Sequence, residues 1–203
     1  MKHQTYDILN VGKNNRFFVM NKDGEPMCVH NCGYGASAGK FAELMKQQGL
    51  AEQADMADEL ITTYRTANNM VSGFWRECNR VLDVLYAGGS CWFGGPDNNL
   101  FYADGSSVFH GVKIPSIRFP NGTYIWYQNL RKEAGDDGRV NYVYDQFKGR
   151  NWLSKRIWGS SLVENLCQAL AFVILKYQAI EMAKQGVPIN LNVHDEWVSV
   201  VPR

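Results

Sequence analysis

The spacing of hydrophobic and polar positions changes several times along the chain. Residues 5–20, TYDILNVGKNNRFFVM, form two apolar stretches around the polar turn GKNN, and residues 27–31, MCVHN, follow a second turn. This pattern predicts three short strands. A β-rich piece of about thirty residues is too small to bury a stable core by itself.

A helical period begins at residue 54 and continues to residue 86. It predicts one long amphipathic helix, or two helices broken near Asn68 and Asn69. The apolar positions that recur at three- and four-residue steps are Leu60, Tyr64, Val71, Phe74, Trp75, Cys78, Leu82 and Leu85.

The middle of the chain has a shorter period. The glycines of AGGSCWFGGPDNN end the helical pattern and begin an irregular region. From Ile117, the segment IRF-PNG-TYIWY predicts a β-hairpin with turn residues at its tip, and VNYVYDQF predicts a further strand.

Residues 161–183 return to a helical period, and Gly186 marks the end of this predicted helix. Two apolar runs, INLNV and WVSVV, then flank three polar residues. They predict a β-hairpin with His194, Asp195 and Glu196 at or near its turn. Helices and strands in this order predict an α+β fold.

Composition narrows the class of protein. The 203 residues suffice for one large domain, or one domain with a small attachment, and 45% hydrophobic residues are typical of a globular core. A net charge of +1 gives no indication of a nucleic-acid or membrane partner. The five cysteines form no CxxC pair, which argues against a zinc site or a disulfide framework and for a reducing compartment.

The sequence predicts neither a signal peptide nor a membrane partner. No apolar run follows the basic residues at the start, and no stretch approaches the roughly eighteen apolar residues of a membrane span. A cytoplasmic location is therefore expected.

The acidic hairpin is a candidate metal site. A metal-using enzyme needs carboxylates that are held rigidly, and the adjacent Asp195 and Glu196 would be anchored by two strands. A solvated acidic turn is the alternative interpretation. The helix before the hairpin carries Glu164 and Gln168, which are four residues apart and therefore on one face.

Four segments together resemble family A DNA polymerases, phage members in particular. Residues 159–202, from GSSLVENLCQALAF to NVHDEWVSVVP, resemble the family's final palm helix and motif C. CGYGASAGKF resembles the end of motif B in the fingers, YRTANNMVSGFWREC the helix downstream of it, and IRFPNGTYIWYQNLR the β-rich stretch before the palm helix. The resemblance covers residues 32–203. It implies a DNA-directed DNA polymerase of a phage-infected or prophage-bearing bacterial cell.

The resemblance implies nucleotidyl transfer with two Mg²⁺ ions, acting on primer–template DNA and dNTPs. Asp195 would be a metal-binding carboxylate. Glu196 would support the metal site or the primer terminus, and His194 would contact the primer backbone.

Further binding residues follow from the same resemblance. Gln168 would face the minor groove of the primer–template end, where acceptor positions are shared by all base pairs. Glu164 lies on that face where better-known members carry an amide, and a surface glutamate is the alternative. Tyr34 would stack at the nucleotide site or on the template base, while Gly33 and Gly35 would allow close backbone approach.

Several expected polymerase segments are not found in this sequence. Motif A, of the form DxSxxE, should precede motif B. DGSSVF at residues 104–109 matches this form only in part, and it follows motif B. The basic residues of motif B should lie upstream of Cys32 and are missing there. We therefore expect the C-terminal piece of a split enzyme, inactive as a polymerase by itself. The end of the chain at VPR, soon after HDE, suggests truncation or a further piece.

Residues 1–31 resemble the C-terminal half of a split intein. TYDILNV and RFFV resemble its penultimate block, and VHN followed by cysteine resembles its terminal block. This resemblance implies that Asn31 cyclises to a succinimide, that His30 assists as an acid or by polarising the carbonyl, and that Cys32 supplies the nucleophilic thiol. The partner would be an N-terminal polymerase fragment that carries the intein N-terminal half.

These resemblances predict four parts and leave three alternatives open. The parts are the intein segment 1–31, a fingers fragment 32–90, a β-rich connecting region 91–158 and a palm fragment 159–203. The alternatives are a non-splicing subunit of a two-chain polymerase, a non-catalytic remnant that binds primer–template, and a metal-dependent nuclease. Loss of ligation in Asn31→Ala and Cys32→Ala variants would distinguish splicing from non-covalent assembly.

Overall fold

A computed structural model describes most of the chain. The described residues are 17–20, 26–29, 37–47, 51–52, 54–135, 138–193 and 196–200. The chain divides into two compact units, Met1–Ser72 and Gly73–Arg203. Each unit is described separately below, and the four parts expected from the sequence stay a prediction.

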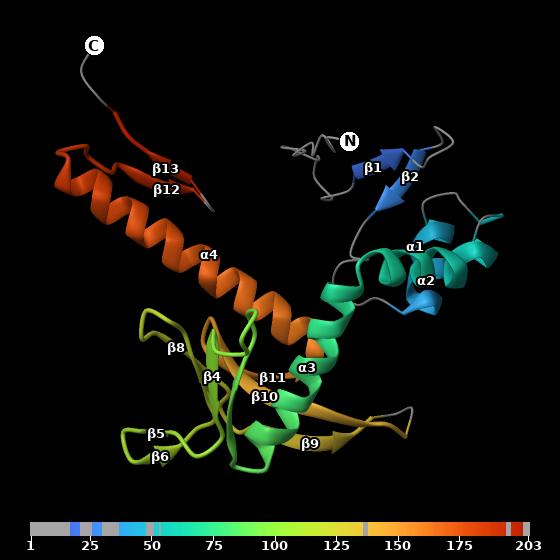
Figure 1. Cartoon of the computed structure of the whole chain (residues 1–203), viewed down its shortest axis with the longest axis horizontal. Coiled ribbons are helices and arrows are strands. Elements are labelled where there is room, and N and C mark those ends of the chain that lie inside the picture. Colours follow the sequence, from blue (N-terminus) through green and yellow to red (C-terminus); the bar gives the residue numbers. More distant parts are fainter. Residues whose placement is uncertain are drawn as a thin grey trace. The chain divides into compact units, whose positions relative to one another are not determined.

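The first unit begins with a small hairpin (Figure 1). Strand β1 (Phe17–Met20) pairs in antiparallel register with β2 (Pro26–Val29), so that Phe17 lies opposite Val29. These strands confirm two of the three predicted in this region. The third, in residues 5–11, lies outside the described residues.

Three helical segments follow, namely α1 (Ala38–Gln47), the 3₁₀ turn η3 (Ala54–Met56) and α2 (Ala57–Ala67). The hydroxyl of Ser37 accepts a hydrogen bond from the backbone N–H of Lys40 at 3.2 Å, which caps the start of α1. Phe41 and Met45, one turn apart on α1, bury their side chains against the other two segments. A small core of this unit results.

The helical pattern of residues 54–86 is interrupted where the sequence suggested. Helix α2 ends at Ala67 and α3 (Asn69–Tyr86) begins two residues later. Asn68 leaves the helical conformation, and both its backbone N–H and its side-chain Nδ2 donate to the carbonyl of Tyr64 at 2.9 Å. The amide side chain thus satisfies a carbonyl at the helix end and ends α2.

The second unit is built on antiparallel sheets. A four-stranded sheet has the order β3-β4-β7-β8, a three-stranded sheet has the order β11-β10-β9, and β5 pairs with β6. The strands are β3 (Ser90–Phe93), β4 (Phe101–Asp104), β5 (Val108–Phe109), β6 (Val112–Lys113), β7 (Ser116–Arg118), β8 (Tyr124–Trp126), β9 (Arg131–Ala134), β10 (Val140–Lys148) and β11 (Asn151–Ile157).

The predicted hairpin after Ile117 and the predicted strand in VNYVYDQF are confirmed as β7–β8 and β10. Asn121 and Gly122 form the hairpin turn, where Gly122 has a φ of 82°, a value that favours glycine. The expectation of an irregular region from residue 87 was wrong at Ser90–Phe93. These four residues pair with β4 across the glycine-rich loop, so tertiary pairing overrides the local turn signals.

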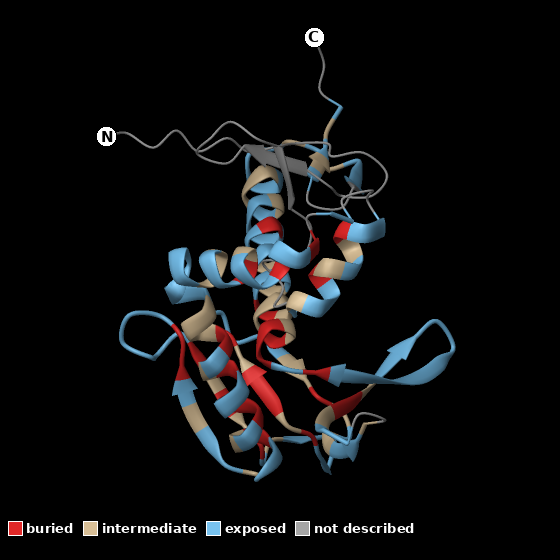
Figure 2. Cartoon of the chain, turned by 90° about the vertical axis from the view of Figure 1, so that its right-hand side faces the viewer, coloured by how far each residue is buried: buried red, intermediate tan, exposed pale blue. Residues whose placement is uncertain are grey.

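The core of the second unit lies between the four-stranded sheet and the helices α3 and α4 (Gly159–Lys184). Figure 2 shows the buried positions concentrated on the strands and on the sides of the helices that face them. The fully buried large side chains include Tyr127, Phe93, Phe101, Leu82, Leu85, Ile117, Leu162 and Leu166. Three cysteines of this unit, Cys78, Cys91 and Cys167, are free thiols.

Helix α4 confirms the helix predicted over residues 161–183, but its apolar stripe is buried only in part. Leu162 and Leu166 have almost no exposed surface, whereas Tyr177 and Ile180 are 63% and 54% exposed. By length and composition α4 could cross a membrane, with a mean hydropathy of 1.3 in its most apolar window. Its first turns belong to the protein core, and a single helix of this kind is weak evidence for a membrane span.

The chain continues into the predicted hairpin, β12 (Leu191–Val193) paired with β13 (Glu196–Val198). Figure 1 shows this hairpin beside the C-terminal half of α4. The backbone N–H of Asn190 donates to the carbonyl of Val198, and the backbone N–H of Val200 donates to Oδ1 of Asn190. These bonds extend the pairing beyond the strands.

Candidate functional site

The start of α4 is fixed by close packing against α3. The backbone N–H of Gly159 donates to Oδ1 of Asn79 at 2.7 Å. A Cβ atom at position 159 would lie 2.0 Å from the carbonyl oxygen of Trp75, so only glycine permits this approach. The hydroxyl of Ser161 caps the helix by bonding both the backbone N–H and the carbonyl of Trp158. The polar face of α4 is therefore held in place from its first residue.

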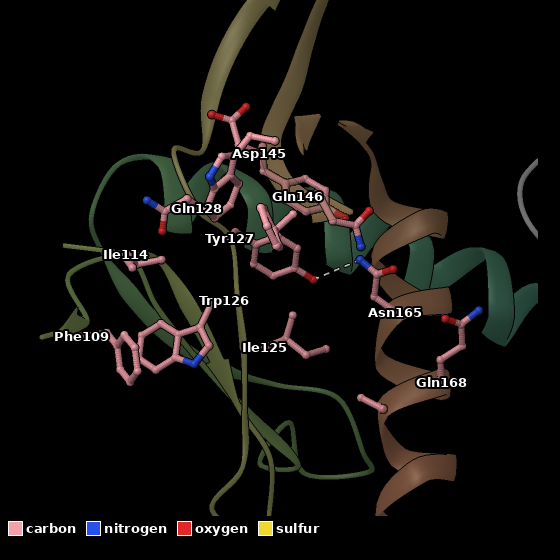
Figure 3. Close-up of a pocket in the computed structure, with 14 residues that line it drawn as sticks. Phe109, Ile114, Ile125, Trp126, Tyr127, Gln128, Asp145, Gln146, Asn165 and Gln168 are labelled. Atoms are coloured by element: carbon pink, nitrogen blue, oxygen red, sulfur yellow. Dashed lines mark hydrogen bonds between the residues drawn. The ribbon is translucent and has the colours of Figure 1, made fainter. Parts of the chain in front are cut away.

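A pocket of about 590 Å³ opens between α4, β8 and β10 (Figure 3). Its walls combine aromatic rings with amide and carboxylate groups. The lining residues are Phe109, Ile114, Ile125, Trp126, Tyr127, Gln128, Tyr144, Asp145, Gln146, Phe147, Trp152, Asn165, Gln168 and Ala169. A concave site with many apolar walls and a few polar groups is typical of ligand binding.

Asn165 and Tyr127 connect α4 to the floor of this pocket. The Nδ2 atom of Asn165 donates to the hydroxyl oxygen of Tyr127 at 3.4 Å, as the dashed line in Figure 3 shows. Burial raises the pKa of the Tyr127 hydroxyl, which stays protonated at any physiological pH. Tyr144 packs edge-on against Tyr127, with 5.2 Å between ring centroids, and its pKa is likewise raised by burial. The pocket floor is neutral.

Glu164 and Gln168 lie together on α4, as their spacing predicts. The Nε2 atom of Gln168 donates to Oε1 of Glu164 at 3.2 Å. Gln168 is exposed and lines the pocket, while Glu164 is half-buried. The hydrogen bond orients the Gln168 amide, whose remaining donor and acceptor can meet a ligand.

A charged cluster holds the other side of the pocket. Both Nδ2 of Asn129 and Nη1 of Arg131 donate to the carboxylate of Asp145 at 2.8 Å, and Arg131 also bonds Glu133 and Ser154. The hydrogen bonds from Asn129 and Arg131 lower the pKa of Asp145. The Asp145 carboxylate is therefore bound by side chains of the protein, and together with Arg131 it links β9, β10 and β11.

The acidic hairpin is described only in part. Glu196 is exposed at the first position of β13, opposite Val193. The following residue, Trp197, donates from its indole Nε1 to the carbonyl oxygen of Leu175 at 2.8 Å. This bond ties the strand that contains Glu196 to the middle of α4. Among the described residues, no group of three or more His, Cys, Asp or Glu side chains could hold a metal ion.

Most other residues predicted for the site lie outside the described part of the chain. These residues are His30, Asn31, Cys32, Gly33, Tyr34, Gly35, His194 and Asp195. Their predicted roles stay predictions.

Sequence reasoning missed three residues that the structure brings beside Gln168, namely Tyr127, Tyr144 and Asn165. Asn165 could have been found, because it lies inside the VENLCQA segment and adjoins Glu164. The two tyrosines carry no such signal, since Tyr127 directly follows β8, Tyr144 lies within β10, and both stand among other apolar residues.

Comparison with known proteins gives one informative similarity. The chain is 24% identical over 174 residues to the DNA polymerase of Bacillus phage SP02, and the match covers 84% of this chain. The chain spans about a quarter of that polymerase's length. No protein-family model matches the chain, and no solved structure matches it. The similarity supports a relationship to a phage DNA polymerase.

Proposed function

We propose that this chain is the C-terminal part of a DNA-directed DNA polymerase that is completed by a second polypeptide. The observation that carries the proposal is the similarity to the phage SP02 polymerase, which extends over most of this chain but a quarter of that protein. The polar face of α4 followed by the β12–β13 hairpin supports it. In that order the chain presents an amide-bearing helix and a carboxylate at a strand end.

Gln168 would bind the primer–template end. Its amide is exposed beside the pocket and is oriented by Glu164, so one donor can reach an acceptor in the minor groove. Such a contact reports base-pair geometry without reading sequence, because every base pair offers an acceptor there. Asn165 would act as a positioning residue, since its bond to Tyr127 fixes the face of α4 that presents Gln168.

Asp195 and Glu196 would form part of a magnesium site. Carboxylate oxygens are ligands that Mg²⁺ prefers, and Glu196 is exposed and forms no ion pair among the described residues. We expect the second polypeptide to supply the further carboxylate that a two-metal site needs. Bound Mg²⁺ would lower the pKa of the primer 3′-hydroxyl and stabilise the leaving pyrophosphate.

Protein splicing would join the two polypeptides. The amide nitrogen of Asn31 would attack its own backbone carbonyl, form a succinimide and release the amine of Cys32. The Cys32 thiol would already have taken over the upstream segment from a thioester, and a shift from sulfur to nitrogen would leave a peptide bond. His30 would donate a proton to the leaving amine. The proposal rests on the resemblance of residues 1–31 to a split-intein C-terminal half, with Cys32 as the first residue after it.

The test combines this chain with a chain that carries motif A, the basic part of motif B and an intein N-terminal half. Intact mass should show a ligated product that lacks residues 1–31, and this product should extend a primer when Mg²⁺ is present. Asn31→Ala should prevent ligation, and Asp195→Asn should permit ligation but abolish extension. Glu181→Gln, which removes a surface carboxylate paired with Lys184, is the matched control.

Two results would count against the proposal. Brisk primer extension by this chain alone would contradict the need for a second polypeptide. If Asn31→Ala and Cys32→Ala mixtures extended primers as well as the unchanged pair, the two-chain polymerase without splicing would replace the spliced one.

A further inference from the structure

The outer face of the four-stranded sheet carries a row of three aromatic residues and one arginine. Strand pairing places Trp92 opposite Tyr102, Tyr102 opposite Arg118, and Arg118 opposite Tyr124. Side chains at directly paired positions point to the same face of a sheet. These four side chains, the outer row, therefore cross β3, β4, β7 and β8 in a single line.

The opposite face of this sheet is the protein core. Phe101, Ala103 and Ile117 alternate with the outer row along β4 and β7 and are almost fully buried. Trp92 and Tyr124 are 51% and 46% exposed in contrast. An antiparallel sheet with one packed face normally has polar residues on the other. Large exposed rings there indicate a binding surface.

Arg118 lies against two rings of the row. Its guanidinium carbon is 5.5 Å from the ring centroid of Trp92 and 5.4 Å from that of Tyr102, within cation–π range. Among the described residues, no carboxylate forms an ion pair with Arg118. The guanidinium charge is therefore held in place by rings, and its donors are available to an anionic ligand.

The outer row borders a hollow of about 440 Å³, which Asp104, Ser107 and Ser116 also line. Oδ1 of Asp104 accepts hydrogen bonds from the backbone N–H and the hydroxyl of Ser106, at 2.8 and 2.7 Å, and so belongs to the turn after β4. Ser107 and Ser116 share a hydrogen bond of 2.7 Å. These polar groups satisfy one another.

The aromatic surface continues beyond the row. Trp126, two residues after Tyr124 on β8, stacks on it with 5.3 Å between centroids, and Phe109 lies 5.1 Å from Trp126. Aromatic rings therefore extend across the strands in the outer row and also along β8 from Tyr124 to Trp126.

We propose that the outer row binds single-stranded nucleic acid, with bases stacked on Trp92, Tyr102 and Tyr124 and a phosphate held by Arg118. Aromatic platforms with a cationic side chain bind single strands without sequence preference, because every base has a π-face. The inference rests on the proposed function, since a polymerase must hold single-stranded template ahead of the duplex. A free guanidinium among the rings favours a phosphate-bearing ligand over an apolar protein segment.

The test measures binding of the purified full chain to a fluorescent oligothymidylate of about 20 nucleotides by anisotropy. Tyr124→Leu and Trp92→Leu should each weaken binding about 5- to 100-fold, whereas Tyr124→Phe, which keeps a ring, should bind as the unchanged chain does. Arg118→Gln should reduce the dependence of log K on log salt by about 0.7, the value for one phosphate of a single strand.

Tyr86→Leu is the matched control. Tyr86 is 48% exposed, which is close to the exposure of Tyr124. It packs edge-on against Tyr142 and lies under Lys132, so its neighbours are an aromatic ring and a cation, as in the outer row. It should leave binding unchanged. Asp104→Asn retains the oxygen that accepts from Ser106 but removes a negative charge from the hollow, and it should strengthen binding.

Photocrosslinking of a bromodeoxyuridine-labelled strand gives a second measurement that needs no variant. Crosslinks should map to the outer row. Crosslinks only elsewhere, or equal affinity of all variants, would overturn the proposal. The proposal would also be overturned if the complementary polymerase chain covered the row and abolished DNA binding. That result would assign the face to a protein partner. Failure of ligation or primer extension with row-dependent DNA binding retained would count against the proposed function alone.

Discussion

The indole Nε1 of Trp197 donates a hydrogen bond to the carbonyl oxygen of Leu175, with 2.8 Å between the two atoms. Trp197 directly follows Glu196, and Leu175 lies in the middle of α4, so this bond positions the acidic hairpin relative to the helix that presents Gln168. A short two-stranded hairpin is marginally stable by itself. Its order depends on contacts of this kind.

Trp197→Phe should loosen the hairpin without unfolding the second unit. The loss of one hydrogen bond should lower the free energy of unfolding by about 1 kcal/mol. Amide hydrogen exchange of residues 190–200 should accelerate more than exchange in the sheet. Trp152→Phe is the control, because that indole is 61% exposed and donates no hydrogen bond within the described part of the chain.

Gly159→Ala should strongly destabilise the second unit. The added methyl group would lie 2.0 Å from the carbonyl oxygen of Trp75, a backbone atom that cannot move without shifting α3. We expect a loss of about 3 kcal/mol in urea denaturation. Gly73→Ala in α3 is the matched control, since its methyl group would meet only the end of Arg76 at 3.8 Å and should stabilise the helix by about 0.5–1 kcal/mol. Equal effects would contradict the packing described here.

The second unit should lose stability in acid as Asp145 becomes protonated. Hydrogen bonds from Asn129 and Arg131 lower the pKa of Asp145 in the folded protein, so its stabilising contribution is complete above the unfolded pKa of about 3.9 and is lost as pH falls through the folded pKa. Asn129→Ala and Arg131→Gln should each raise this pKa in an NMR titration of the carboxyl carbon. An unchanged midpoint in both variants would contradict the assigned causes.

Cys78 should resist alkylation in the folded protein. Burial raises the pKa of its thiol to about 12, so almost no thiolate exists near neutral pH. Iodoacetamide should label the exposed Cys167 while leaving Cys78 unmodified, as peptide mapping by mass spectrometry would show. In urea both should react. Labelling of Cys78 under native conditions would show that the core opens readily.

Gln168→Ala should impair primer extension by the assembled polymerase. If its amide contacts the primer–template end, the loss of about 1.4 kcal/mol of binding would reduce extension from dilute DNA about tenfold. Gln146→Ala, which alters an exposed amide of the same pocket on β10, should have little effect. A similar loss in both variants would assign the effect to the pocket as a whole.

The sequence by itself determined the local elements. Helical and alternating periods predicted α3, α4, β7–β8, β10 and β12–β13, and the paired asparagines predicted the break at Asn68. Periodicity predicts these elements because residues on one face of a helix or strand recur at a fixed spacing, so burial of that face requires apolar residues at that spacing. The motif order also indicated a polymerase relationship, which the phage similarity supports.

Only the tertiary structure decided which distant side chains meet. Asn165 and Tyr127 are 38 residues apart, and neither local period reveals their hydrogen bond. The outer row likewise depends on the register of four strands, and a shift of one residue would move each ring to the opposite face. The partly exposed stripe of α4 shows the same limit, since an apolar face predicts burial but not which neighbour supplies it.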